Sequence, residues 1–191
     1  MKNQMTGDEH LVFDGMPVGY TLRDFWAWNS SNLLDNTARG HFCEFLVASA
    51  LGIDLSGTNE DWLPYDLLFI NDNKNIRIEV KSAAYLQAWE RSKLSGIQFT
   101  IRPTRAWDPE HGYSDTLVRQ SDIYIFCLYT ETNRELADPL QLDGWDFYVL
   151  PTYVLDDQCG AQKTISFSRL LDLKPIKADY STIRAAVEAL T

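Results

Sequence analysis

Three residues in this chain could together carry out metal-dependent chemistry on a phosphodiester: Asp66, Glu79 and Lys81. Two carboxylates supply the hard oxygen ligands that Mg²⁺ and Mn²⁺ prefer in proteins. A lysine beside them could orient or deprotonate a water molecule that attacks phosphorus. The three side chains can cooperate only if the elements that carry them bring them to one place.

Two short apolar runs on either side of an Asn-rich turn predict a β-hairpin that carries all three residues. The runs cover residues 66–70 and 76–81. The second run alternates apolar and charged residues, and successive side chains of a strand point to opposite faces. Glu79 and Lys81 therefore share one face, and they meet the carboxylate of Asp66 if that residue opens the neighbouring strand at the same end.

An acid-x-Lys pattern is weak support when it stands alone. It occurs here three times, at 72–74, 79–81 and 172–174. The first copy lies in the turn and the third runs into Pro175, so only the middle copy lies on an alternating strand with an acid on the strand before it. The hairpin by itself fits equally well a half-exposed pair of strands with a solvated, charged face.

A third acid lies inside an apolar helix upstream of the hairpin. Residues 37–52 predict a helix, because apolar side chains recur at the three-and-four spacing of a buried stripe and Gly52 can end it. Glu44 lies beside that stripe, where a carboxylate is costly unless it is paired or binds a cation. An exposed position at the border of the stripe would explain Glu44 as well.

Together these features resemble a known group of proteins. Glu44 in an early helix, Asp66 at the start of a strand and Glu79-Val80-Lys81-Ser82 on the next strand are similar to the PD-(D/E)xK nuclease superfamily. The resemblance covers approximately residues 37–150. It implies the restriction-endonuclease-like fold.

Two stretches, 21–28 and 79–87, resemble more narrowly an uncharacterised bacterial family within that superfamily, to which no specific activity is attached. One departure concerns the Pro-Asp pair of the superfamily. Here it reads Pro64-Tyr65-Asp66, with one residue inserted.

The resemblance implies a Mg²⁺- or Mn²⁺-dependent DNA endonuclease. Asp66 and Glu79 would hold the cation together with the main-chain carbonyl of Val80, and Lys81 and Glu44 would complete the catalytic set. Nearby polar residues are candidate accessory groups, although each also fits a structural role: Ser82, Gln87 and, if its strand pairs beside the motif strand, Gln98.

Composition sets limits on the class of protein. A chain of 191 residues with six Trp, nine Tyr and nine Phe predicts one folded domain over residues 1–191. No apolar run is long enough to cross a membrane. Three distant cysteines without a Cys-x-x-Cys pair argue against a disulfide framework or a zinc site and favour the cytoplasm.

The net charge of −10 counts against nucleic-acid binding, but its distribution is uneven. Residues 74–119 contain eight basic residues and five acids, interleaved with aromatic residues that could stack on bases. This region equally fits a mildly basic loop with core aromatics, and the acidic remainder would suit a protein that recruits DNA through a partner subunit. The candidate DNA contacts are Arg91, Lys93, Arg102, Arg105 and Arg119.

The order of elements predicts an α/β fold, with a mixed central sheet of about five strands flanked by helices. Thr21 and Asp24 form a candidate capping box at the start of the first helix. The expected segments are an N-terminal helix at 21–35, a helix at 37–52, strands at 66–70, 76–81, 97–102, 122–129 and 145–150, a loop at 103–118, and a C-terminal helical segment at 165–190.

Three functions remain compatible with the sequence. The chain could be an active nuclease, a catalytically silent nuclease fold that binds DNA or a protein, or an interaction subunit whose acidic face matters more than the cluster. The complete set of two acids and a lysine favours the first, since a silent module would be free to lose Asp66 or Lys81. DNA is the expected partner, and a second copy of the chain or another subunit could join it.

Overall fold

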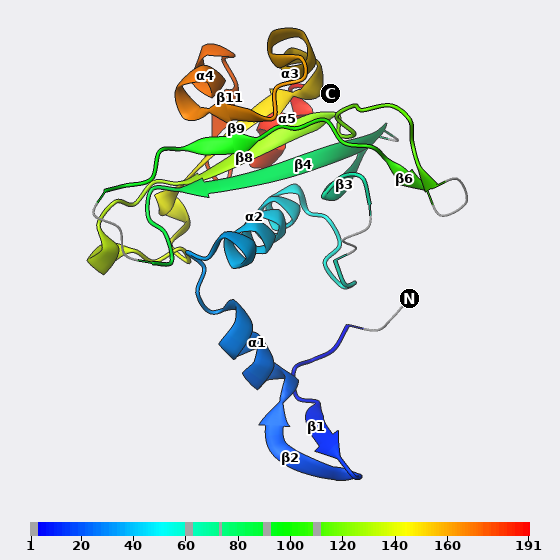
Figure 1. The fold of residues 1–191 in the computed structure, drawn as a ribbon, viewed down its shortest axis with the longest axis vertical. Coiled ribbons are helices and arrows are strands. Elements are labelled where there is room, and N and C mark those ends of the chain that lie inside the picture. The colour runs from blue at the N-terminus through cyan, green and yellow to red at the C-terminus, as the bar shows by residue number, and fades with distance from the viewer. Residues whose placement is uncertain (1–3, 60–62, 73, 90–92, 109–111) are drawn as a thin grey trace.

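A mixed five-stranded sheet forms the centre of the protein in a computed structural model that describes residues 4–59, 63–72, 74–89, 93–108 and 112–191 (Figure 1). The strand order is β11-β9-β8-β4-β3. The β4 and β8 strands run parallel, and the other neighbours are antiparallel. The strands span Leu67–Asn71 (β3), Lys74–Ala84 (β4), Ile123–Tyr129 (β8), Trp145–Pro151 (β9) and Ile176–Ala178 (β11). The expected α/β architecture is therefore confirmed.

The β8 strand is buried along its whole length because elements cover both faces of the sheet. One face packs against the helices α2 (Asn36–Leu51) and α5 (Ile183–Glu188). The other face is covered by α3 (Thr152–Cys159), by α4 (Phe167–Asp172) and by a two-stranded sheet of β5 (Gln98–Thr100) and β10 (Thr164–Ser166). A continuous apolar run is the expected sequence of a strand in this position.

The predicted helix at 37–52 is present as α2, and its ends are set by local chemistry. The side chain of Asp35 accepts hydrogen bonds from the amides of Thr37 and Ala38 at the N-terminus. Gly52 ends the helix in the left-handed conformation, at φ 74°, and its amide donates to the carbonyls of Ala48 and Ser49.

The first predicted helix is shorter than expected. The α1 helix spans Leu22–Ser30 and begins with the capping box of Thr21 and Asp24 that the sequence predicts. The expected extension to residue 35 is wrong, because Asp35 has an extended backbone in order to cap α2. Residues 31–34 form a turn between the two helices.

Two predictions about the sheet are also wrong. The strand expected at 97–102 is only β5, and it pairs with β10 instead of entering the central sheet. The β8 strand takes the place beside β4, since its apolar run can be covered on both faces. The segment 165–190 is not continuously helical: Pro175 follows α4, and β11 then adds the fifth strand at the outer edge of β9.

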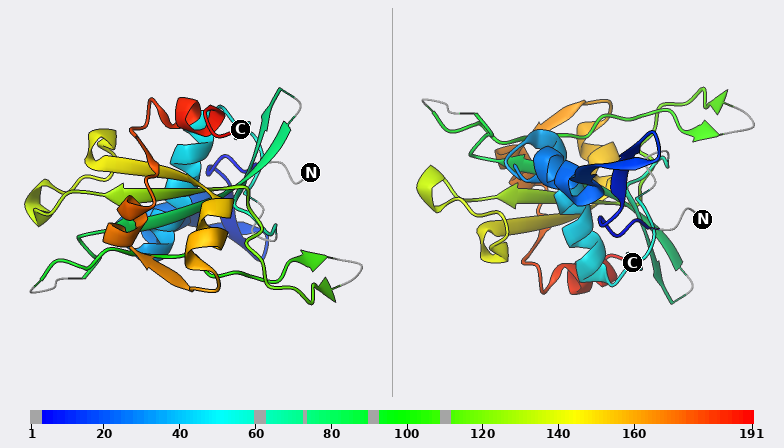
Figure 2. Two further views of the ribbon diagram at one scale, coloured as in Figure 1. Left: turned by 90° about the horizontal axis from the view of Figure 1, so that it is seen from above. Right: turned by 90° about the horizontal axis from the view of Figure 1, so that it is seen from below.

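Several short elements complete the described chain. The β1 (His10–Phe13) and β2 (Met16–Thr21) strands form a hairpin that, with α1, projects from the body of the protein (Figure 1). In the views from above and below, which look along this direction, the hairpin and α1 overlap the body (Figure 2). The expected loop at 103–118 carries a small hairpin of β6 (Trp107–Asp108) and β7 (Gly112–Tyr113). Two 3₁₀ turns, η1 (Arg134–Leu136) and η2 (Leu142–Gly144), lie between β8 and β9.

The helices of the described ranges are too short or too polar to pass through a membrane. All three cysteines, Cys43, Cys127 and Cys159, are buried and carry free thiols.

Arg119, expected to contact DNA, is instead an interior residue. Its guanidinium donates to the carbonyl of Ile101 at 2.8 Å, to that of Gly160 at 2.9 Å and to the carboxylate of Asp156 at 2.6 Å. The Arg119 side chain is 1% exposed. It therefore joins the end of β5 to the end of α3 and cannot present its charge to a phosphate.

We predict that Arg119→Ala lowers the free energy of unfolding by about 3 kcal/mol, because it leaves buried carbonyls without a donor. Chemical denaturation measures this loss. The exposed Arg102→Ala is the matched control and should change stability by less than about 0.5 kcal/mol. Equal stability of the two variants would contradict a structural role for Arg119.

Candidate active site

The candidate site forms where β4 extends beyond its neighbour β3. The β3 strand begins to pair with β4 at Leu67, opposite Ile78, whereas β4 continues to Ala84. Asp66 lies at this step in the sheet. Its amide donates to the carbonyl of Ile78 at 3.0 Å, and its carboxylate accepts from the amide of Val80 at 2.7 Å. The side chain of Asp66 therefore takes the place of a strand partner at the open edge of β4.

Glu79 and Lys81 meet Asp66 at this edge. The Lys81 Nζ lies 2.6 Å from Glu79 Oε1 and 3.5 Å from Asp66 Oδ2. The hydroxyl of Ser121, directly before β8, donates to Glu79 Oε2 at 3.0 Å. All three charged side chains are between 20% and 26% exposed, so substrate could reach them while most of each side chain is shielded from water.

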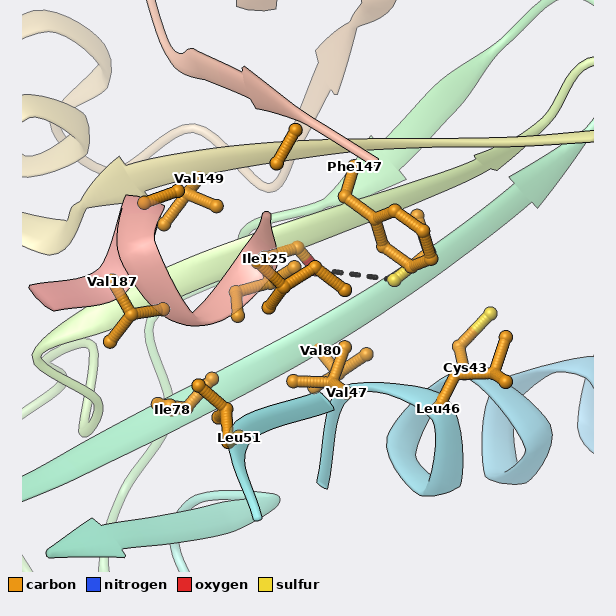
Figure 3. Packing of buried hydrophobic residues seen from close by; sticks show 14 of the residues in the cluster. Cys43, Leu46, Val47, Leu51, Ile78, Val80, Ile125, Phe147, Val149 and Val187 are labelled. Atoms are coloured by element: carbon orange, nitrogen blue, oxygen red, sulfur yellow. Dashed lines mark hydrogen bonds between the residues drawn. The ribbon is translucent and has the colours of Figure 1, made fainter. Parts of the chain in front are cut away.

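Val80 contributes its main chain to the edge and its side chain to the core. The side chain packs beside Cys43, Leu46 and Val47 of α2 (Figure 3). The Val80 amide faces Asp66, and the N–H and C=O of one strand residue point to the same side. The Val80 carbonyl therefore faces the same open edge as the two carboxylates.

Glu44 approaches the cluster from α2, on the other face of the sheet. Its Oε2 accepts a hydrogen bond from Asn59 Nδ2 at 2.9 Å. Burial raises the pKa of the Glu44 carboxyl, the negative charge of Asp66 raises it further, and the hydrogen bond from Asn59 partly opposes the shift. The charge of Asp66 thus affects the pKa of Glu44. No hydrogen bond or ion pair joins Glu44 to the described side chains of Asp66, Glu79 or Lys81.

The cluster contains more negatively than positively charged side chains. Burial raises the pKa of Glu79, and the negative charge of Asp66 adds to this effect. Burial alone would lower the pKa of Lys81, but the negative charges of Asp66 and Glu79 outweigh it and raise that pKa. Lys81 is therefore an ammonium at neutral pH, and it balances only part of the surrounding negative charge.

The donor set at this edge fits a divalent cation of the Mg²⁺ type. Within the described residues, no three Asp, Glu, His or Cys side chains stand close enough to hold a metal by themselves. Two carboxylates and the Val80 carbonyl nevertheless provide hard oxygen donors, and Mg²⁺ ordinarily keeps several waters in its remaining positions. The Lys81 Nζ lies between Asp66 and Glu79, so a cation bound to both would displace it.

The three expected accessory residues lie elsewhere. Gln98 is on β5, outside the central sheet, and its amide donates to Thr164 Oγ1 at 3.0 Å. Ser82 alternates with Lys81 along β4 and so points to the opposite face. The Gln87 amide donates to the carbonyl of Ala84 at 3.1 Å. None of the three belongs to the cluster, and Gln98 lies away from it because its strand pairs with β10.

Two polar residues that hydrogen-bond to the site were not predicted from the sequence. Ser121 reaches Glu79 because β4 and β8 run parallel in a register that places Glu79 beside Tyr124. Asn59 reaches Glu44 from the loop after α2. A prediction that β4 and β8 are parallel neighbours would have pointed to Ser121, whereas no sequence signal marks Asn59.

The expected DNA contacts are only partly surface residues. Lys93, Arg102 and Arg105 are exposed, together with the aromatic residues Trp89, Trp107 and Tyr113. The hairpin of β6 and β7 that carries two of these aromatics extends beyond the sheet (Figure 1). Arg91 lies outside the described residues, and Arg119 is buried.

Comparison with known proteins gives limited information. No protein-family model matches the chain, and no curated protein sequence matches it significantly. Among solved structures, the bacterial homing endonuclease I-Ssp6803I is similar to 69% of this chain over 76% of its own, with 17% sequence identity and a TM-score of 0.37. A similarity of this size carries no argument, so the function is inferred from the cluster itself.

We predict that Glu44→Gln stabilises the protein at about pH 7 by roughly 0.5–1 kcal/mol, because it removes a half-buried charge. The raised pKa means that the folded state binds the Glu44 proton more tightly than the unfolded state does. The charged form therefore costs stability above the raised pKa, and this cost disappears as pH falls below the ordinary value of 4.5.

Denaturation of both proteins across this pH range measures the difference, which should vanish at low pH. The exposed Glu135→Gln is the control and should leave stability unchanged throughout. A Glu44→Gln variant that is less stable than the wild type at about pH 7 would contradict a destabilising charge at Glu44.

Proposed function

We propose that this protein is a metal-dependent deoxyribonuclease of the PD-(D/E)xK superfamily, which hydrolyses phosphodiester bonds with Mg²⁺ or Mn²⁺. The main support for this proposal is that the side chains of Asp66, Glu79 and Lys81 contact one another at the open edge of β4. This strand edge is accessible, so a substrate could reach the two carboxylates and the ammonium there.

Asp66 and Glu79 would hold the cation with the carbonyl of Val80, and the cation would supply Lewis-acid activation of the scissile phosphate and the attacking water. The protein fixes both carboxylates in advance. The amide of Val80 orients Asp66, and the hydroxyl of Ser121 orients Glu79. Such fixed donors do not have to reorganise when charge develops in the transition state.

Lys81 acts as a charged hydrogen-bond donor in this proposal. Without a cation, the negative charges of Asp66 and Glu79 raise the pKa of Lys81, so the lysine is an ammonium there and not a proton acceptor. The ammonium can instead orient the attacking water and offset the negative charge that builds up on the phosphate. Of the two roles that the sequence leaves open to the lysine, we propose that it orients the water, because its amine already lies within 2.6 Å of a carboxylate oxygen of Glu79 and can donate at this edge.

DNA would approach from the side that carries the exposed basic and aromatic residues. Lys93, Arg102 and Arg105 can contact phosphates, and Trp107 and Tyr113 can stack on bases. Contacts between these basic side chains and phosphates release counterions from DNA, so DNA affinity should fall steeply as salt concentration rises.

One observation favours a second candidate function. The ammonium of Lys81 already fills the space between Asp66 and Glu79, so the cluster is also complete as an ion-paired group without a cation. A catalytically silent nuclease fold that binds DNA or a protein partner would have this arrangement. The two functions differ in whether the purified protein cleaves DNA.

We predict that the purified protein cleaves plasmid, linear or branched DNA with Mg²⁺ or Mn²⁺. Lys81→Ala and Asp66→Asn should each lower the rate at least ~100-fold, the typical loss when a preorganised donor or ligand is removed. Matched controls come from Lys177 and Asp146, a second Lys–Asp pair on the central sheet with 2.9 Å between the charged atoms.

Lys177→Ala and Asp146→Asn should keep wild-type activity, because these residues are on the β11–β9 side of the sheet. Gel electrophoresis of the products measures cleavage, and circular dichroism confirms that each variant is folded. Absence of cleavage of all three DNA forms with both metals, or full activity of Lys81→Ala, would reject the nuclease in favour of the silent module.

A further inference from the structure

Residues 4–31 form a unit that we call the N-terminal arm: the hairpin of β1 and β2 followed by α1. The arm stands apart from the sheet and its covering helices (Figure 1). Among the described residues, the one hydrogen bond between the arm and the body joins Gln4 Nε2 to the carbonyl of Leu55 at 3.4 Å. The arm is therefore held to the rest of the protein mainly by the chain at residues 32–35.

The surface of the arm is strongly apolar. Phe13 pairs with Met16 across the hairpin, and alternation along β2 places Val18 and Tyr20 on the same face. Phe13 is 78% exposed and Trp28 of α1 is 83% exposed, and α1 has no buried residue. The exposed large apolar side chains of the arm beyond residue 10 are Leu11, Val12, Phe13, Met16, Val18, Tyr20, Phe25, Trp26 and Trp28.

The arm buries little apolar surface within itself. An isolated two-stranded hairpin is marginally stable, and three or more strands or a packed helix are needed for independent stability. Complete burial of a large apolar side chain contributes roughly 1.5–3 kcal/mol, and each of these partly exposed side chains forgoes a part of that. The local bonds that shape the arm, such as the Thr21–Asp24 capping box, are themselves exposed. A surface that covers these side chains would therefore stabilise the arm.

The charge of the arm limits the classes of molecule that could cover its apolar side chains. It contains four acids, Asp8, Glu9, Asp14 and Asp24, against one basic residue, Arg23. Phosphates of nucleic acids and of anionic lipids would be repelled by this balance. An apolar protein surface fits the arm better than a phosphate-bearing one, provided that apolar packing outweighs any like charge on that surface.

The exposed area matches what one copy contributes to a stable dimer. Large apolar side chains present about 150–250 Å² each when aromatic, so the nine residues, which lie on both faces of the hairpin and on α1, together expose on the order of 1,000 Å². A standard protein–protein interface buries about 800 Å² on each partner. In a two-fold symmetric dimer the same patch occurs on both copies, so each arm meets an apolar arm of equal size.

We propose that the N-terminal arm is a homodimer interface, in which the apolar faces of the arms of two copies pack against each other around a two-fold axis. The contact is independent of the proposed nuclease function, since neither Asp66, Glu79 nor Lys81 takes part in it. Because the contact is apolar between two acidic surfaces, the dimer persists or tightens at high salt, which screens the like charges.

Sedimentation equilibrium and light scattering of the full chain test this proposal. The wild type is expected at twice the chain mass of 21.9 kDa, with a dissociation constant of ~1 µM or lower. The double variant Phe13→Asp/Trp28→Asp should weaken the dimer at least ~100-fold. Circular dichroism should show an intact body, because neither side chain contributes to the core.

The matched control is Leu136→Asp/Leu140→Asp, which adds the same two charges at exposed apolar positions far from the arm. It should leave the dimer intact. A wild type that is monomeric at about 100 µM, a dimer that withstands the arm substitutions, or a dimer that both double variants weaken equally would each overturn the proposal. A monomer would mean that another protein covers the arm.

Discussion

The hydrogen bond from the Val80 amide to the Asp66 carboxylate, at 2.7 Å, is the interaction on which the candidate site depends. It exists because β4 is longer than β3, so that the amide of Val80 has no strand partner on that side. The carboxylate that satisfies the amide is thereby held beside Glu79 and Lys81. One mismatch in strand length thus turns the edge of a structural sheet into a place where charged groups converge.

Local patterns in the sequence were enough to predict the parts of the protein that position this site. The hairpin follows from two apolar runs and a turn, and alternation alone assigns Glu79 and Lys81 to one face and Val80 to the core. The α2 helix was predicted nearly to the residue because Gly52 ends it. These features depend on neighbours within a few positions, which is the range over which a sequence pattern is informative.

The errors arose where the partner of a segment is distant in the chain. Alternation correctly identified β5 as a strand, but pairing with β10 decided its place, and so Gln98 lies away from the cluster. The β11 strand follows Pro175 within a segment that reads as helical, and only the free edge of β9 makes it a strand. The charge of Arg119 suggested a surface residue, whereas three main-chain carbonyls and Asp156 hold it inside.

The central claim is that the open edge of β4 binds a divalent cation through Asp66 and Glu79. Anomalous diffraction from crystals soaked in Mn²⁺ tests it most directly. The account predicts a single strong peak within about 2–2.5 Å of a carboxylate oxygen of each residue and of the Val80 carbonyl, with the Lys81 ammonium moved out of the space between them. No peak at this edge under saturating Mn²⁺, with Lys81 still bridging Asp66 and Glu79, would contradict it.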